Sequence, residues 1–107
     1  MQIPNYVALG ELIEILESAD SMRRVRFGFG SPRSYRGDYS EVAFSPETDT
    51  TIGKMAEHAR SALGRTFQGY KGGDFTMYES TACHIAEYGE AGGDRIGPTL
   101  LRYWLED

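Results

Sequence analysis

The segment 31–37 carries residue types that bind phosphate or carboxylate groups. Arg33 and Arg36 supply forked guanidinium donors, which match the paired oxygens of such anions. Ser34 can add a hydroxyl donor, and Tyr35 offers a flat ring on which a planar group can stack. The chemistry predicted for this segment is binding of an anion that also carries a ring.

The segment 70–73 has the same ingredients in a shorter form. Tyr70 supplies a ring and Lys71 a cation, while Gly72 and Gly73 leave backbone N–H groups able to point at an anion. If the two segments converge, they form a site for an anionic, ring-bearing small molecule. A nucleotide, such as a cyclic nucleotide, is the candidate ligand.

Two further residues, Thr76 and Arg95, are second-rank candidates for the same site. An alternative interpretation remains open, in which the arginines pair with Glu11, Glu14 or Asp38 and the glycines only make turns. On that interpretation the two segments are structural.

No catalytic or metal-binding constellation is evident. Cys83 and His84 are adjacent, and consecutive residues of a strand point to opposite faces, so they are not expected to act as nucleophile and base. His58 lies off the apolar stripe of its expected helix, and two histidines with one cysteine give no zinc-ligand spacing. We therefore predict neither an enzyme nor a bound metal or cofactor.

The charge is unevenly distributed along the chain. The net charge of −5 disfavours general binding of nucleic acid. Residues 1–20 contain only acidic charges, whereas residues 21–37 and 58–73 contain only cationic ones, eight of the eleven in the chain. An alternative function follows from the acidic part: a protein inhibitor that mimics a phosphate backbone through Glu11, Glu14, Glu17 and Asp20 and so occupies a nucleic-acid-binding enzyme.

Length and composition predict one globular domain, residues 1–107. The single cysteine permits no internal disulfide, which fits a reducing compartment. The first 16 residues lack a signal-peptide pattern, and no apolar run has the length of a membrane helix. We therefore expect a cytoplasmic protein without a membrane partner.

The first half of the chain predicts a helix over 7–18 with Asn5 as its cap. A half-buried strand is predicted over 24–29, with Val25, Phe27 and Phe29 inward and Arg24 and Arg26 outward. A long loop over 28–39 follows, and a short strand over 40–44 closes at Ser45-Pro46.

The second half predicts a helix over 51–63, capped by Thr50 or Thr51 and ended by Gly64. Turns are predicted over 69–73 and 90–94. Between them, residues 75–88 form one long strand or two short ones broken near Glu79-Ser80. The segment from Pro98 is a helix or a terminal strand. The fold class is α+β, with two or three helices on a small, mostly antiparallel sheet.

Three blocks carry a family resemblance: GFGSPRSYRGDYSEVAFSP, GRTFQGYKGGDFTM and GGDRIGPTLLRYWL. With its S-Y-R-G-x-Y and G-Y-K-G-G-x-F-T-M motifs, the chain from about Phe27 onward resembles a family of small proteins with no assigned activity. Bacteriophages encode them, particularly those that infect actinobacteria. The resemblance implies a phage accessory protein in the host cytosol. For the alternative function, it implies that the acidic surface inhibits a host nuclease or defence effector.

Small acidic phage proteins often antagonise host defences, and one strategy is an oligomer that sequesters cyclic or ADP-ribose-derived nucleotide signals. Both predicted anion-binding segments lie in the most distinctive blocks of the family. We therefore expect non-catalytic binding of a phosphate-bearing nucleotide. A homo-oligomer is expected because a chain of 107 residues makes a shallow pocket that a second subunit can close.

Overall fold

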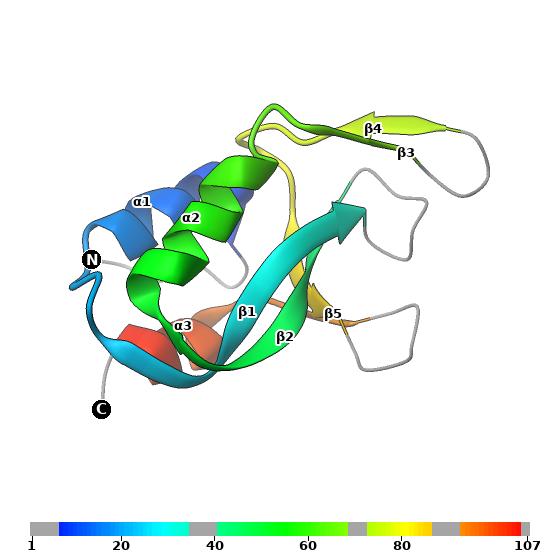
Figure 1. Ribbon diagram of the computed structural model, residues 1–107. Helices are drawn as coiled ribbons and strands as arrows, with labels where there is room; N and C mark the ends of the chain where they lie inside the picture. The colour runs from blue at the N-terminus through cyan, green and yellow to red at the C-terminus, as the bar shows by residue number, and fades with distance from the viewer. Residues whose placement is uncertain (1–6, 35–40, 69–72, 87–92, 106–107) are drawn as a thin grey trace.

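A computed structural model describes residues 7–34, 41–68, 73–86 and 93–105 of the chain (Figure 1). Its elements are, in order, α1 (Leu9–Glu17), β1 (Arg24–Ser34), β2 (Val42–Thr51), α2 (Ile52–Ala62), β3 (Thr66–Gln68), β4 (Asp74–Thr76), β5 (Cys83–Ala86), β6 (Gly93–Arg95) and α3 (Pro98–Leu105). The predicted α+β class is confirmed. Within the described residues, no helix is long and apolar enough to cross a membrane.

The larger sheet has the strand order β1-β2-β5-β6, and β3 and β4 form a separate two-stranded sheet. Neighbouring strands are antiparallel except for β2 and β5, which run parallel. The sheet is thus mostly antiparallel, as predicted. Figure 1 shows α1 and α2 side by side, with α2 against β1 and the β3–β4 hairpin extending away from the helices.

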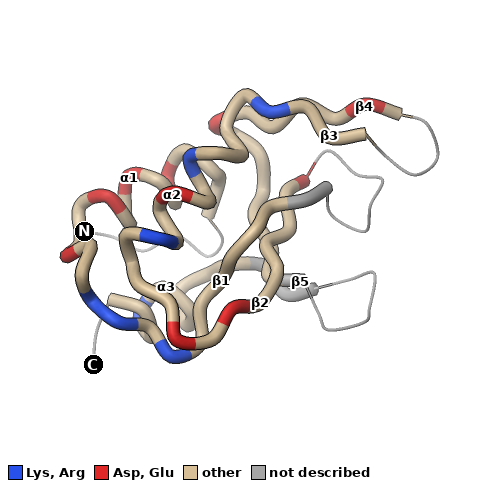
Figure 2. The backbone as a smooth tube through the Cα atoms, in the orientation of Figure 1, with Lys and Arg blue, Asp and Glu red and all other residues tan. Residues whose placement is uncertain are grey.

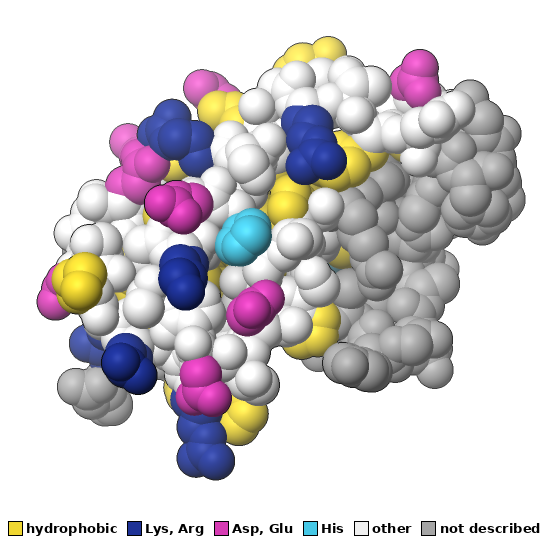
Figure 3. All heavy atoms as spheres, in the orientation of Figure 1, with side chains coloured by type: hydrophobic (Ala, Val, Ile, Leu, Met, Phe, Trp, Pro, Cys, Tyr) yellow, Lys and Arg dark blue, Asp and Glu magenta, His cyan; other side chains and the backbone are white. Residues whose placement is uncertain are grey.

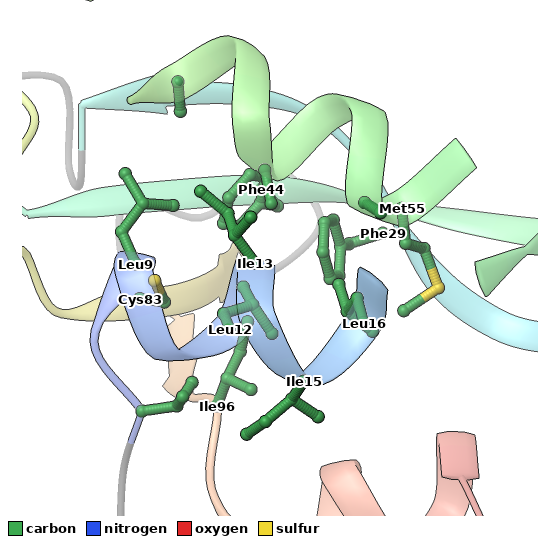
Figure 4. Close-up of a cluster of buried hydrophobic side chains, with 14 of the residues drawn as sticks. Leu9, Leu12, Ile13, Ile15, Leu16, Phe29, Phe44, Met55, Cys83 and Ile96 are labelled. Atoms are coloured by element: carbon green, nitrogen blue, oxygen red, sulfur yellow. The ribbon is translucent and has the colours of Figure 1, made fainter. Parts of the chain in front are cut away.

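The helices bury the apolar stripes that their sequences predict. The stripe of α1 is at most 4% exposed and comprises Leu9, Leu12, Ile13 and Leu16. In α2, four residues of the predicted stripe are buried, Ile52, Met55, Ala56 and Ala59, whereas Leu63, also predicted to belong to it, is half-buried and Ala62 is buried instead. These side chains meet Phe29 of β1 and Phe44 of β2, whose ring centroids lie 4.3 Å apart (Figure 4). Burying these surfaces together is the main source of stability in a domain of this size.

The start of α1 differs from the prediction. The N-cap is Ala8 rather than Asn5, and the helix begins at Leu9. The preceding residues are extended because the Val7 N–H donates to the Ile96 carbonyl at 2.9 Å and Ala8 bridges Ala82. Contacts with distant segments therefore override the local capping preference.

The loop predicted over 28–39 is wrong for its first part, because β1 continues to Ser34. A register shift between Phe29 and Pro32 accommodates the sequence Gly30-Ser31-Pro32 within the strand. β1 also lies at the edge of the sheet, where a proline without an N–H is tolerated. Residues 35–39 lie outside the described residues.

The predicted end of the second strand at Ser45-Pro46 is also wrong, because β2 runs on to Thr51. The parallel pairing with β5 ends at Phe44 and Ile85. Beyond that point β2 pairs with β1 and no longer with β5. Pro46, which has no N–H, therefore costs no hydrogen bond to β5.

The centre of β1 breaks the predicted alternation. Phe27 is 56% exposed, although it was predicted to face the core. Gly28 instead lies against α2, where a Cβ atom would come within 2.7 Å of Met55 Sδ. The Phe27 N–H donates to Tyr103 Oη at 3.3 Å, and Trp104 Nε1 donates to the Phe27 carbonyl at 2.9 Å. α3 thus covers the free edge of β1 and satisfies its backbone.

The predicted limits of the second helix are confirmed to within one residue at each end. Thr51 is its N-cap, and its side chain accepts a hydrogen bond from the Lys54 N–H at 3.2 Å. Gly64 follows the C-cap with φ of 78°, a conformation that glycine adopts without a steric cost. The Gly64 N–H donates to the Met77 carbonyl at 2.7 Å, which ties the end of α2 to the segment after β4.

The remaining alternatives are decided by the structure. Residues 75–88 contain two separate strands in two sheets, with a turn at Glu79-Ser80, so the second of the two predictions is confirmed. The segment from Pro98 is a helix. The turn over 90–94 is wrong at Gly93 and Asp94, which pair with β5 in β6.

Candidate functional site

The described structure brings two of the predicted ligand residues into one row across the sheet. Arg33 pairs with Ala43, Ala43 with His84, and His84 with Arg95. Neighbouring strands are about 4.8 Å apart, so the backbones of Arg33 and Arg95 are separated by about 14 Å. Sequence reasoning nominated these two arginines separately, and nothing in the local sequence predicts their common row.

At the centre of this row, the buried His84 pairs with the half-buried Glu41. His84 is 4% exposed, and its Nε2 lies 2.5 Å from Glu41 Oε1. His84 is one of three buried polar residues among those the structure describes, with Thr50 and Thr81. Sequence reasoning missed the pair because Glu41 and His84 meet only through the parallel pairing of β2 with β5, which no local pattern predicts.

Cys83 precedes His84 in β5, and its side chain lies in the hydrophobic core and not beside the polar pair. It belongs to the hydrophobic cluster with Val42 and Phe44, and its thiol lies 3.7 Å from the Thr81 carbonyl. Burial raises the pKa of the Cys83 thiol far above its usual range. Because the reactive form of cysteine is the thiolate, this environment suits a structural role.

The predicted ligand residues differ in how much of each the structure describes. For Arg33, Ser34 and Arg95 the structure describes the backbone in β1 and β6. Gly73 lies within the described residues, and for Thr76 the side-chain position is described as well. The predictions that fall outside the described residues are those for Tyr35, Arg36, Tyr70, Lys71 and Gly72.

Thr76 and Gly73 lie on the β3–β4 hairpin. Thr76 Oγ1 is 2.8 Å from Thr66 Oγ1 on the opposite strand, and Phe67 pairs with Phe75 beside them. A Cβ atom at Gly73 would lie 3.3 Å from the Phe75 ring, so the glycine backbone lies close to that ring. The hairpin thus carries a threonine hydroxyl pair on one face and two half-buried aromatic rings on the other.

β1 and β3 contact each other, and both run toward the same end of the molecule (Figure 1). One range of described residues stops at Ser34, the last residue of β1, and the next stops at Gln68, the last residue of β3. Five of the predicted ligand residues lie in the stretches that follow these two points. We call the end of β1 together with the β3–β4 hairpin the sheet-end region.

A second hollow region was missed by sequence reasoning. One cavity of about 450 Å³ lies between α1 and the end of α2, and is lined by Gly10, Glu11, Ile13, Glu14, Glu17, Arg60, Leu63 and Glu79. An adjoining cavity of about 490 Å³ is lined by Leu63, Gly64, Met77, Tyr78, Glu79 and Ser80. We call these two cavities together the acidic groove. On the surface drawn in Figure 3, by contrast, acidic and basic side chains alternate over α2.

The acidic groove contains one ion pair in the described part of the chain. Arg60 Nε and Nη2 each lie 2.6 Å from a carboxylate oxygen of Glu17. This forked hydrogen bond lowers the pKa of Glu17 and raises that of Arg60. Both side chains are exposed, so solvent screens the pair and its contribution to stability is small.

No protein family, curated protein or solved structure matches the chain. Among residues 7–34, 41–68, 73–86 and 93–105, no group of three or more His, Cys, Asp or Glu side chains is placed to hold a metal ion.

Proposed function

We propose that the protein binds a phosphate-bearing nucleotide at the sheet-end region without catalysing its conversion. The observation that carries the proposal is the contact between β1 and β3, which run to the same end of the molecule. The first segment with predicted anion donors begins in the last residues of β1, and the second follows β3. A shared site requires the segments 31–37 and 70–73 to lie close together, and the contact between β1 and β3 favours this.

In this proposal, cations from both segments hold the anionic groups. Arg33, Arg36 and Lys71 bind phosphate oxygens, and charge-assisted hydrogen bonds of this kind are about twice as strong as neutral ones. Ser34 and the backbone N–H groups of Gly72 and Gly73 add neutral donors. The ring of Tyr35 or Tyr70 stacks on a base.

The cross-strand row supports a role for Arg95 in the same site. Arg95 and Arg33 occupy register positions on either side of Ala43 and His84. The proposal requires both guanidinium groups to lie on the face of the sheet that carries His84. Two arginines whose backbones lie about 14 Å apart along the row suit a ligand with two separated phosphates better than a single free phosphate.

The resemblance to phage proteins provides a biological context for such a binder. We propose a phage accessory protein of the host cytosol that sequesters a nucleotide defence signal as a homo-oligomer. Sequestration demands tight binding with no turnover. A second subunit would close a pocket that one small domain leaves shallow.

Native mass spectrometry of the purified protein tests the proposal. The protein is sprayed alone and with a panel of cyclic dinucleotides, cyclic trinucleotides and cyclic ADP-ribose isomers. We expect a stable adduct of unmodified ligand mass, with the oligomeric state visible in the same spectrum. A panel without adducts, or recovery of hydrolysed nucleotide, would overturn the proposal.

A pair of double variants locates the site. We expect Arg36→Ala with Lys71→Ala to weaken binding by more than about 100-fold, because two charge-assisted hydrogen bonds are lost. The matched control is Arg24→Ala with Arg102→Ala, which removes the same charge from exposed positions outside the site. If the first variant unfolds by circular dichroism, those residues are structural and the site assignment fails.

A further inference from the structure

We propose that the acidic groove binds a basic amphipathic segment of a protein partner. The groove lies between α1, the C-terminal end of α2 and residues 77–80. It is independent of the nucleotide proposal, because none of the predicted nucleotide-binding residues lines it. Figure 2 shows acidic positions along α1, at the side of the molecule away from the tip of the β3–β4 hairpin.

The floor of the acidic groove is apolar and held in place by the backbone. Leu63, which lines both cavities, is half-buried and provides the accessible part of this floor, while Ile13 and Met77 lie beneath it, 4% and 0% exposed. The Gly10 N–H donates to the Glu79 carbonyl at 2.9 Å, and a Cβ atom at Gly10 would lie 3.0 Å from Glu79 Cβ. Glycine at this position therefore lets α1 approach the far wall closely. Such a floor accepts apolar side chains with little reorganisation.

The rim of the acidic groove carries more carboxylates than cations. Glu11, Glu14 and Glu17 recur every third residue on α1, so neighbouring ones are about 4.5 Å apart along the helix axis. Glu79 lies on the opposite wall. Arg60, the one basic residue of the lining, is already held by Glu17.

The carboxylates of Glu11, Glu14 and Glu79 differ in the hydrogen bonds and ion pairs that they form. Glu11 Oε1 accepts a hydrogen bond from the Ala8 N–H at 3.3 Å. Within the described residues, Glu14 and Glu79 form no ion pair. These two carboxylates are therefore the main attraction for an incoming cation.

Both features together determine the kind of partner. An apolar floor rewards Leu-like side chains, and a carboxylate rim rewards Lys or Arg beside them, which is the pattern of a basic amphipathic helix. The exposed ring of Tyr78 borders the second cavity, where it can contact a cation or an apolar side chain. Anionic lipids and nucleic acid are disfavoured because the rim repels phosphate. A protein that mimics a phosphate backbone needs acidic groups but no apolar floor, so the floor favours the amphipathic partner over that alternative.

The experiment is a titration of ¹⁵N-labelled protein with a synthetic, end-capped amphipathic peptide of leucine and lysine. Two peptides of equal length serve as comparisons, one with every lysine replaced by glutamate and one with every leucine replaced by serine. We expect shifts of the amide resonances of Ile13, Glu14, Leu63 and Tyr78 with the first peptide only, and at least tenfold weaker binding of the other two. Absent shifts, shifts scattered over the surface, or equal binding of the leucine-free peptide would overturn the proposal.

Charge variants of the groove provide a second test. We expect Glu14→Gln with Glu79→Gln to weaken peptide binding at least about fivefold, because two screened ion pairs are lost. The matched control, Glu47→Gln with Glu57→Gln, removes two exposed carboxylates outside the groove and should change binding less than twofold. Nucleotide adducts in native mass spectra should be the same for both variants. Equal weakening by the control would show that the peptide responds only to net charge.

Discussion

The acidic groove and the sheet-end region meet at the base of the β3–β4 hairpin, yet they are built in opposite ways. The groove takes most of its lining from α1 and the end of α2, and its carboxylates follow helical spacing. The sheet-end region depends on the contact of β1 with the β3–β4 hairpin, and the adjoining row depends on strands β1, β2, β5 and β6, which are far apart in the chain. One region therefore depends on local periodicity, and the other on register.

The two regions also differ in charge, which the net value of −5 conceals. The groove carries four carboxylates and one paired arginine. The segments that follow β1 and β3 carry Arg36 and Lys71 without an acid before residue 38 or residue 74. A small domain can thus present two surfaces that attract ligands of opposite sign.

The largest expected effect is that of Trp104→Ala, which tests whether the two regions share one scaffold. Trp104 is 1% exposed, its ring centroid lies 5.4 Å from that of Phe29, and its Nε1 donates to the Phe27 carbonyl. We expect a loss of about 3–5 kcal/mol in the free energy of unfolding, measured by urea denaturation. Peptide and nucleotide binding should disappear together. Survival of one alone would mean that the regions fold separately.

A smaller effect is expected for Gly28→Ala, at the contact between the sheet and α2. The new methyl group would lie 2.7 Å from both Met55 Sδ and Thr50 Cγ2. We expect about 1–3 kcal/mol of destabilisation from overpacking, again by urea denaturation. Because α2 is the element displaced, peptide binding should weaken before nucleotide binding does. The reverse order would contradict the assignment of the groove to the helices.

Thr51→Ala should cost about 1 kcal/mol, because it removes the side chain that caps α2. Thr51 accepts from the Lys54 N–H at the end of the helix remote from the groove. We therefore expect lower thermal stability with unchanged affinity for both ligands. Thr51→Ser, which keeps the hydroxyl, is the control. A change in peptide affinity would show that the whole of α2, and not its C-terminal end, shapes the groove.

The smallest effect concerns Arg60→Gln and is specific to the acidic groove. The forked hydrogen bond from Arg60 lowers the pKa of Glu17 below its ordinary value of 4.5. A lowered native pKa stabilises the fold at pH values above 4.5, and this contribution is lost as the pH falls through the native pKa. In the variant we expect the pKa of Glu17 to rise toward 4.5, as followed by carboxyl ¹³C shifts. An unchanged value would mean that the pair does not persist in solution.

The helices show how far sequence patterns reach. The limits of α2, its cap at Thr51 and the glycine at position 64 follow from residues within one or two turns of each other, and these predictions are confirmed. For the segment from Pro98, local patterns left a helix and a terminal strand open, and the helix is confirmed. Local hydrogen bonding and periodicity are enough to specify such elements.

The strands show where the same patterns fail. Local sequence predicted that Pro32 lies in a loop and that Pro46 ends a strand, yet both lie within strands. A proline is tolerated only where the neighbouring strand is absent or shifted, and that depends on the partner and not on the proline. Phe27 was assigned to the core by strict alternation, yet it is 56% exposed, because Gly28 and not Phe27 lies against α2.

The sequence by itself determined the α+β class, the helices, their buried stripes and the uneven distribution of charge, since these depend on residues close together in the chain. Only the tertiary structure decided that Arg33 and Arg95 share a row with His84, and that Glu79 closes a groove begun by α1. Register and groove walls join residues that are distant along the chain, so their positions follow from packing the whole domain and not from any local pattern.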